Sequence, residues 1–189
     1  HAQGKNLDDF AGSKSASILV SDITRPAPSH IMLPPLVRRL KDLGISDLKI
    51  VFALGTHRKM TVEEERLLLR GCTCLPYMQH DTKNCVYMGE PGRGTPVEIL
   101  EAVASSDLIV ATGNIEYHYY AGYSGGCKAV LPGVSSERSV IKNHELMRDP
   151  HSITGRLDSP VRQDMEDAAK IAGLDFILNV VLNGKNEIV

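Results

Sequence analysis

The alternation of short apolar runs with amphipathic segments constrains this chain more than any other feature of its sequence. Apolar runs with the length and residue content of buried strands occur at 18–20, 48–54, 108–112 and 176–182. Segments with apolar residues at helical spacing occur at 33–43, 137–147 and 161–172. Parallel strands need a crossover connection, which is usually a helix, so this order indicates a helix-covered parallel sheet. We therefore predict an α/β fold with a Rossmann-like parallel sheet and flanking helices.

Local signals set the expected boundaries between these elements. Thr61 followed by Glu64 is the pattern of a capping box, which predicts a helix over 61–70. Residues 71–95 carry Cys, Pro, Asn and Gly at short intervals, so we expect them to be irregular. A proline then favours the start of a short helix over 96–104.

Length and composition narrow the class of protein. The 189 residues suit one domain, and a net charge of -2 gives no large positive field for binding nucleic acid. No apolar run approaches the roughly 20 residues that span a bilayer, so we expect a cytoplasmic protein. The four cysteines have neither the density of a disulfide framework nor zinc-site spacing. Residues 1–16 are predicted to be a tag remnant or a poorly ordered segment, with the folded domain over 17–189.

Three polar or glycine-rich segments come directly after predicted strands. Asp22–Pro26 follows the first strand and Gly55–Arg58 follows the second. The segment 113–128 opens a long glycine-rich loop, 113–135, after the third. The carboxyl ends of parallel strands lie at one edge of the sheet, and open α/β sheets bind their ligands there. We therefore expect the three segments to meet and form a site.

The first two segments carry groups that bind anions or transfer protons. The fork of Arg25 can bind a carboxylate or phosphate at two points, although a local ion pair with Asp22 is an equally open interpretation. His57 follows a Gly-Thr turn, where an imidazole can take or give a proton near neutral pH. A lone histidine is nevertheless more often structural.

The segment HYYAGYSGGCK, from His118 to Lys128, is the most specific feature of the chain. Its glycines allow the backbone to approach a ligand closely. It is not a Walker A motif, because a cysteine separates the paired glycines from the lysine and Ala129 stands where Ser or Thr would hold magnesium. The LPG turn at 131–133 either ends the loop or fixes Lys128. His144 falls in a predicted helix, where a structural role is the ordinary interpretation.

Together these motifs resemble the lactate racemase family: DITRP at 22–26, GTHR at 55–58, HYYAGYSGGCK at 118–128, LPG at 131–133, and His144. Their order and spacing make the resemblance specific, and it runs from about Ser17 to the end of the chain. It implies the N-terminal, cofactor-binding domain of a two-domain enzyme. The family's C-terminal domain is absent from this chain, so we expect the fragment alone to be inactive or nearly so.

The resemblance also implies a cofactor, the nickel(II) pincer nucleotide, a pyridinium-3,5-bisthiocarboxylic acid mononucleotide made by dedicated synthesis enzymes. By motif match, Lys128 would tether it covalently as a thioamide and His144 would be a nickel ligand, in keeping with the preference of nickel(II) for nitrogen donors. Further cofactor contacts would come from Asp22, Arg25, Gly122, Ser124, Gly125 and Gly126. Arg25 would hold an anionic group, either the substrate carboxylate or the cofactor phosphate.

The implied reaction is the racemisation or epimerisation of lactate or a related 2-hydroxyacid. His57 and His118 would be paired acid–base groups, one on each face of the substrate carbon. One takes the hydroxyl proton while hydride leaves C2 for the cofactor, and the resulting 2-keto acid is reduced again on its other face. One alternative is a repurposed nucleotide- or metal-binding protein of the same fold without racemase activity. A zinc hydrolase is another, but the chain lacks HExxH spacing.

Overall fold

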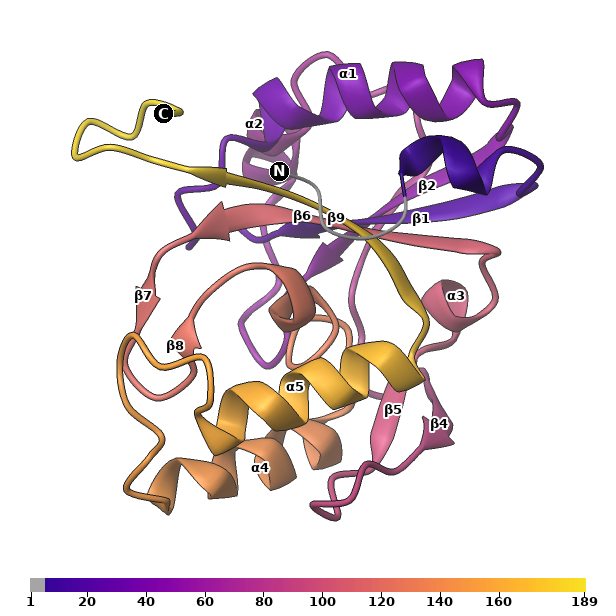
Figure 1. Ribbon diagram of the computed structural model, residues 1–189. Coiled ribbons are helices and arrows are strands. Elements are labelled where there is room, and N and C mark those ends of the chain that lie inside the picture. The colour runs from indigo at the N-terminus through magenta and orange to yellow at the C-terminus, as the bar shows by residue number, and fades with distance from the viewer. Residues whose placement is uncertain (1–5) are drawn as a thin grey trace.

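The computed structural model describes residues 6–189 and is built around a five-stranded parallel sheet (Figure 1). The strand order is β3-β2-β1-β6-β9. The strands are β1 (Ser15–Ser21), β2 (Asp47–Ala53), β3 (Tyr77–Gln79), β6 (Leu108–Ile115) and β9 (Leu174–Val181). The predicted α/β fold is confirmed, and β1, β2, β6 and β9 contain or overlap the predicted apolar runs.

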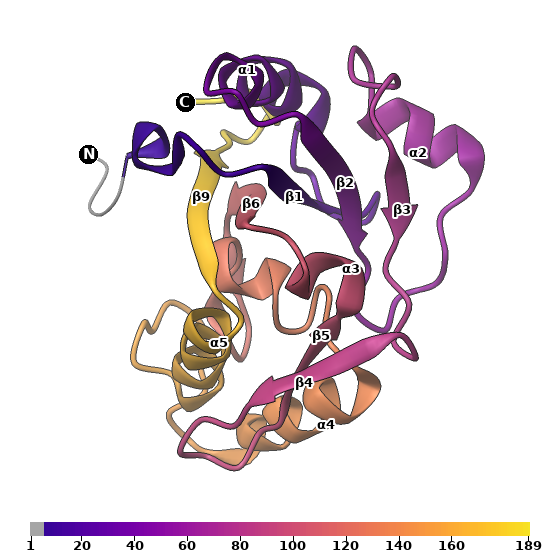
Figure 2. The ribbon, with the colours of Figure 1, turned by 90° about the vertical axis from the view of Figure 1, so that its right-hand side faces the viewer.

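The central strand β1 is buried on both faces. Its residues Ile18 and Val20 belong to one apolar core, whereas Leu19 between them belongs to the other. This follows from the two-residue period of a strand, which sends successive side chains to opposite faces. Helices α1 (Ser29–Asp42) and α2 (Val62–Leu68) cover the first face, as Figures 1 and 2 show.

Helix α2 begins at the predicted capping box. The hydroxyl of Thr61 accepts a hydrogen bond from the backbone N–H of Glu64 at 3.3 Å. The Glu64 carboxylate accepts one from the N–H of Thr61 at 2.8 Å. Two otherwise unpaired amides at the helix start are thereby satisfied.

The second face of the sheet is covered by shorter elements and two helices (Figure 2). They are α3 (Glu101–Ala104), the 3-10 turns η2 (Gly126–Ala129) and η3 (Leu146–Arg148), α4 (Glu137–Glu145) and α5 (Pro160–Ile171). Two hairpins lie outside the main sheet, β4 (Cys85–Gly89) with β5 (Val97–Leu100) and β7 (Tyr117–His118) with β8 (Gly122–Tyr123). The second core joins β1, β2 and β6 to this layer.

Two boundary predictions are wrong. Residues 97–100 form strand β5 rather than the start of the helix predicted over 96–104, and α3 begins only at Glu101. The reason is tertiary, because Val97 and Ile99 are buried in the second core and β5 pairs antiparallel with β4. For the same reason the segment 71–95 is not wholly irregular and contains β3 and β4.

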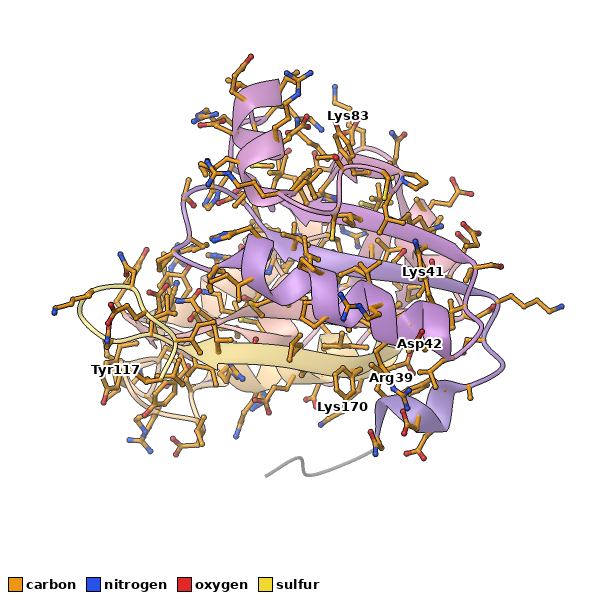
Figure 3. All side chains as sticks on the ribbon, turned by 90° about the horizontal axis from the view of Figure 1, so that it is seen from above. Arg39, Lys41, Asp42, Lys83, Tyr117 and Lys170 are labelled. Atoms are coloured by element: carbon orange, nitrogen blue, oxygen red, sulfur yellow. The ribbon has the colours of Figure 1, made fainter. Side chains whose placement is uncertain are left out.

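The N-terminal boundary also lies earlier than predicted. Part of the expected tag remnant falls on residues 1–5, which lie outside the described residues. Residues 7–10 form the 3-10 turn η1 (Leu7–Phe10), whose Leu7 packs into the first core. Arg39 of α1, labelled in Figure 3, pairs with Asp8 of this turn. Residues 6–16 therefore belong to the folded unit and are not poorly ordered.

The predicted loop over 113–135 is more structured than expected. It contains the end of β6, the β7–β8 hairpin and η2. Within residues 6–189, no helix has both the length and the apolar character needed to cross a membrane.

Candidate active site

The three segments that follow β1, β2 and β6 meet at the carboxyl edge of the sheet, as predicted, and α4 lies beside them. There they line one cleft, which we call the central cleft. It is lined by Asp22, Arg25, His57, His118, Ser124, Gly125, Gly126, Lys128 and His144. Of the residues predicted from the sequence, Gly122 does not line it. The crossover topology thus gathers side chains that lie far apart in the chain.

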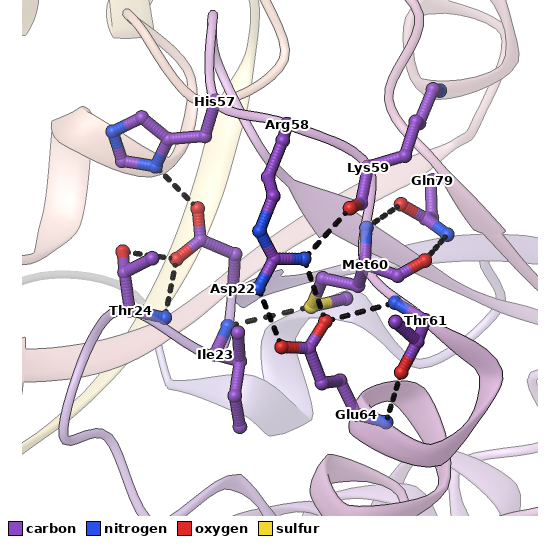
Figure 4. A network of polar contacts seen from close by, with 10 residues as sticks. All are labelled: Asp22, Ile23, Thr24, His57, Arg58, Lys59, Met60, Thr61, Glu64 and Gln79. Carbon is purple, nitrogen blue, oxygen red and sulfur yellow. Dashed lines mark hydrogen bonds and ion pairs between the residues drawn. The ribbon is translucent and has the colours of Figure 1, made fainter.

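His57 is held by a buried carboxylate. Its Nδ1 lies 2.5 Å from Oδ2 of Asp22, whose side chain is 4% exposed, whereas the imidazole is 45% exposed (Figure 4). The other oxygen of Asp22 accepts hydrogen bonds from the N–H and the hydroxyl of Thr24. Because a carboxylate can only accept, Nδ1 of His57 carries the hydrogen and Nε2 is left free to take a proton. The open question of an Asp22–Arg25 ion pair is settled, since Asp22 pairs with His57.

The loop that carries His57 is tied to α2 on its outer side. Arg58 binds both oxygens of Glu64, at 2.8 and 2.6 Å (Figure 4). This pairing and the bond to the Thr61 amide lower the pKa of Glu64 to about 2. Arg58 is thereby engaged at the surface, and it does not line the central cleft.

His118 sits on the β7–β8 hairpin in a different environment. Its side chain is buried, and Nδ1 accepts a hydrogen bond from the backbone N–H of Ala121 at 3.3 Å. Burial and the nearby positive charges of Lys128 and Arg25 lower its pKa to about 4. At neutral pH the ring is therefore uncharged, with its hydrogen on Nε2.

Lys128 lies in η2 and lines the central cleft. Burial and the positive charge of Arg25 lower its pKa to about 7. A large fraction of the amine is therefore neutral and nucleophilic at physiological pH. The backbone N–H of Gly133 donates to the carbonyl of Lys128 at 3.0 Å, and the Gly133 carbonyl accepts from Gly55 at 2.8 Å. The LPG turn thus holds Lys128 and joins it to the His57 loop.

His144 is presented by α4 with one nitrogen available. Its Nδ1 donates to the carbonyl of Val140 at 2.7 Å, so the neutral ring has an unprotonated Nε2. Burial lowers its pKa, which favours this neutral form. The helix is anchored beside it, because Asn143 donates to the carbonyl of Val161 and to the carboxylate of Asp164 on α5. A histidine whose other nitrogen is bound to a carbonyl has the usual arrangement of a metal ligand.

Arg25 brings a second positive charge to the central cleft. Its backbone N–H donates to the carbonyl of Asp22 at 3.1 Å, which fixes the loop. Within residues 6–189 its guanidinium makes no ion pair with a carboxylate. Together with Lys128 it makes the cleft suited to an anionic ligand.

The glycine-rich segment divides into cleft-lining and structural positions. Gly125 and Gly126 line the cleft with φ values of 77° and 57°, which favour glycine. The hydroxyl of Ser124 is used inside the protein, where it bonds the carbonyl of Asn114 and the N–H of Glu116. The prediction that Gly122 contacts the ligand is not supported by its position. A Cβ at Gly122 would lie 1.9 Å from the carbonyl oxygen of Arg156, so close packing explains that glycine.

Sequence reasoning missed Tyr120, whose ring lines the central cleft. Neighbouring tyrosines at 117, 119 and 123 gave no signal to single it out. The distinction comes from the tight hairpin, which exposes Tyr119 and turns Tyr120 inward beside His118.

No group of three or more His, Cys, Asp or Glu side chains in the described part of the chain is arranged to hold a metal ion. A zinc site made of protein ligands alone therefore has no candidate set among residues 6–189. A metal bound through His144 would need its other donors from a bound group.

Comparison with known proteins identifies the family of this chain. A family model described as the lactate racemase N-terminal domain matches residues 2–155. The chain belongs to this family. The lactate racemase of Thermoanaerobacterium thermosaccharolyticum is 38% identical over 195 residues, covering 98% of this chain and 46% of the relative. That of Lactiplantibacillus plantarum is 36% identical over 193 residues, covering 97% of this chain and 46% of the relative.

Solved structures show the same fold for this lactate racemase N-terminal domain. The lactate racemase apoprotein from Thermoanaerobacterium thermosaccharolyticum superposes with a TM-score of 0.94 at 37% identity, covering all of this chain and 48% of that one. A protein from Thermotoga maritima shares the fold, with a TM-score of 0.80, 24% identity, and coverage of 97% of this chain and 50% of that one. The chain spans about half the length of the curated relatives it matches.

Proposed function

We propose that this chain is the cofactor-binding half of a racemase or epimerase that acts on lactate or a related 2-hydroxyacid. The observation that carries the proposal is the composition of the central cleft. It combines a lysine amine whose pKa is lowered to about 7, a free imidazole nitrogen on His144, an arginine without an ion pair among residues 6–189, and two imidazoles in different hydrogen-bonding states. The named relatives are lactate racemases, which supports the substrate class.

The residues of the cleft fit a nickel pincer nucleotide. Lys128 would attach it covalently, because its amine is a nucleophile at neutral pH; a thioamide C–N bond to one thiocarboxylic acid arm would form with loss of water. Nε2 of His144 would provide a nickel donor. Gly125 and Gly126, which line the cleft, would contact the nucleotide through their backbone, and Arg25 offers a charge to its phosphate or to the substrate carboxylate. When bound, the group supplies a reversible hydride acceptor for C2 of the substrate.

The two histidines would perform the proton transfers. His57 is prepared as a base, because Asp22 holds its hydrogen on Nδ1 and would stabilise the imidazolium that forms. His118 begins as a hydrogen-bond donor through Nε2. Acylation of Lys128 would remove one positive charge that lowers the pKa of His118, and a carboxylate beside Arg25 would offset another. Occupation of the cleft would thus make His118 a better proton acceptor.

The proposal also names partners and a location. The cofactor-synthesis enzymes would deliver the nucleotide in the cytoplasm. The remaining half that the relatives carry would close the cleft and complete the substrate site, so we expect this chain alone to have little or no racemase activity.

Intact-mass and nickel measurements test the proposal directly. The protein is produced together with the cofactor-synthesis enzymes, beside Lys128→Arg and the surface control Lys142→Arg. We expect a nickel-bearing covalent adduct in the parent and the control and none in Lys128→Arg, since a guanidinium cannot form the thioamide. An unmodified parent, despite a competent cofactor supply, would instead favour a repurposed binding protein.

A further inference from the structure

Tyr120 lies between two histidines that come from separate elements. Its ring centroid is 4.6 Å from that of His118 on β7 and 5.2 Å from that of His144 on α4. The interplanar angles are 82° and 70°, so both contacts are edge-to-face. Among the aromatic contacts of the described residues, Tyr120 is the ring that touches both imidazoles.

Hydrogen bonds alone leave each imidazole partly free. Among residues 6–189, His118 has one ring hydrogen bond, from the N–H of Ala121 to Nδ1, and His144 has one, from Nδ1 to the carbonyl of Val140. A single bond fixes one ring atom and the tautomer, but the ring can still turn about that bond. Aromatic contacts set the ring plane, and for His144 the described contact of this kind is with Tyr120.

Tyr120 is itself held on several sides. Its carbonyl accepts a hydrogen bond from the hydroxyl of Ser159 at 2.8 Å, and Ser159 is fully buried before α5. The ring of Tyr119 packs edge-on against it at 4.5 Å. Burial and Tyr119 raise the pKa of Tyr120 to about 12, so the ring stays uncharged over the physiological range. The residue is therefore a fixed support.

We propose that Tyr120 is a positioning residue that holds the imidazoles of His118 and His144 in a fixed mutual orientation. The inference rests on the proposed function, in which His118 moves a proton and His144 offers a metal donor. The two rings would otherwise be set independently, one by a hairpin and the other by a helix. Contact through one shared ring makes the orientation of each depend on the same side chain.

The neighbouring tyrosines provide matched controls. Tyr119 stacks on His118 at 4.9 Å and packs against Tyr120, but it is not in ring contact with His144. Tyr119→Leu should therefore disturb His118 directly and His144 less, through Tyr120 alone. Tyr117, which is 72% exposed and labelled in Figure 3, packs against Tyr123 and neither histidine. Tyr117→Leu should disturb neither imidazole.

The test is nitrogen-edited NMR of the imidazoles in the 189-residue chain, which needs no cofactor. His118→Gln and His144→Gln variants assign the signals, and the remaining histidine signals and thermal unfolding check the fold. We expect Tyr120→Leu to shift and broaden the ring signals of both His118 and His144, and Tyr120→Phe to leave both near their parent positions. Tyr120→Met, whose flexible side chain fills similar space, replaces Tyr120→Leu if that variant unfolds.

Unchanged His144 signals in a folded Tyr120→Leu or Tyr120→Met protein would overturn the positioning role. Equal disturbance by Tyr120→Phe would also overturn it, because the ring contacts would then not be the cause. In the complete, cofactor-loaded enzyme we expect Tyr120→Leu to lower kcat by on the order of 10²-fold with little change in KM, and Tyr120→Phe to restore it. A parent without racemase activity would reject the proposed function, whereas the NMR result judges the positioning role by itself.

Discussion

The loops that carry His57 and His118 meet in one cleft but control their imidazoles by opposite means. The His57 loop pairs a half-exposed ring with the buried carboxylate of Asp22. The β7–β8 hairpin buries His118 without a carboxylate among its described partners and leaves it near the positive charges of Lys128 and Arg25. The first histidine is prepared by the protein itself, whereas the second depends on what occupies the cleft.

The two histidines proposed as the acid–base pair therefore lie in unlike environments. The proposed reaction needs a proton acceptor on each face of the substrate carbon, but the two acceptors need not be built alike. A fixed carboxylate supports the imidazolium of His57 at all times. For His118, the support would come with an acylated Lys128 and a bound anion.

The largest expected effect is at Asp22. Asp22→Asn keeps the shape of the side chain but removes the charge and allows the wrong tautomer of His57, so we expect kcat of the complete, loaded enzyme to fall by about 10²- to 10⁴-fold. Racemase assays in both directions measure it. Nitrogen-edited NMR of His57 checks the tautomer. An unchanged kcat in a fully loaded variant would show that the Asp22 carboxylate does not support His57 during the reaction.

The next effect is on stability and compares the cost of a glycine substitution in each of the two loops. Gly122→Ala would place a Cβ 1.9 Å from the carbonyl oxygen of Arg156, at a φ of 75°. We expect a loss of about 3 kcal/mol in the free energy of unfolding. A Cβ at Gly55 in the His57 loop would have its nearest neighbour at 3.4 Å, so Gly55→Ala should lower the free energy of unfolding by only about 1 kcal/mol. Urea unfolding compares them, and equal losses would mean that the hairpin has more room than its packing shows.

A third effect concerns acid stability. The unfolded His118 takes a proton near pH 6.5, but the folded ring takes one only near pH 4. Between these values the unfolded state binds more protons, so stability should fall by about 2 kcal/mol as the pH drops from 6.5 to 4. His118→Gln should flatten this dependence in urea titrations. An unchanged pH dependence in this variant would show that the buried His118 is not its source.

The smallest effect tests the outer support of the His57 loop. Glu64→Gln keeps the capping box with Thr61 but weakens the exposed pairing with Arg58. We expect at most a small loss in the free energy of unfolding, because solvent screens the pair. Thermal unfolding measures the change. A destabilisation as large as that of Gly122→Ala would show that this pairing, and not Asp22, is the main support of the loop.

Much of the fold could be predicted from the sequence because strands β1, β2 and β6 are long and strongly apolar. The capping box at Thr61 and Glu64 could also be predicted, because it depends only on residues that are close together in the sequence. Strand β5 could not be predicted, because Pro96 resembles a helix start and the strand forms through burial and pairing with β4. Tertiary contacts, which local sequence patterns do not show, determine the secondary structure of that segment.

The candidate site was predictable at the level of segments but less so for single side chains. Topology brings the ends of the strands together, and the motif residues identify His57, His118, Lys128 and His144. The need for glycine at position 122 comes from close packing against the carbonyl of Arg156, which lies in a distant loop and cannot be inferred from the motif. The different states of the two catalytic candidates depend on hydrogen bonds and neighbouring charges that only the folded chain displays.

The strand order β3-β2-β1-β6-β9 has a consequence for how the protein would acquire its cofactor. The cleft draws on segments that follow β1, β2 and β6 and on α4, so no part of the chain can assemble it locally. Contacts of such long sequence separation are the slow ones in folding. Any ligand that fits the cleft therefore reports on the global folding equilibrium, and at one hundred times its Kd it would add about 2.7 kcal/mol of stability. A tether at Lys128 would accordingly mark chains that have completed folding, because the amine reaches its reactive state only inside the finished cleft.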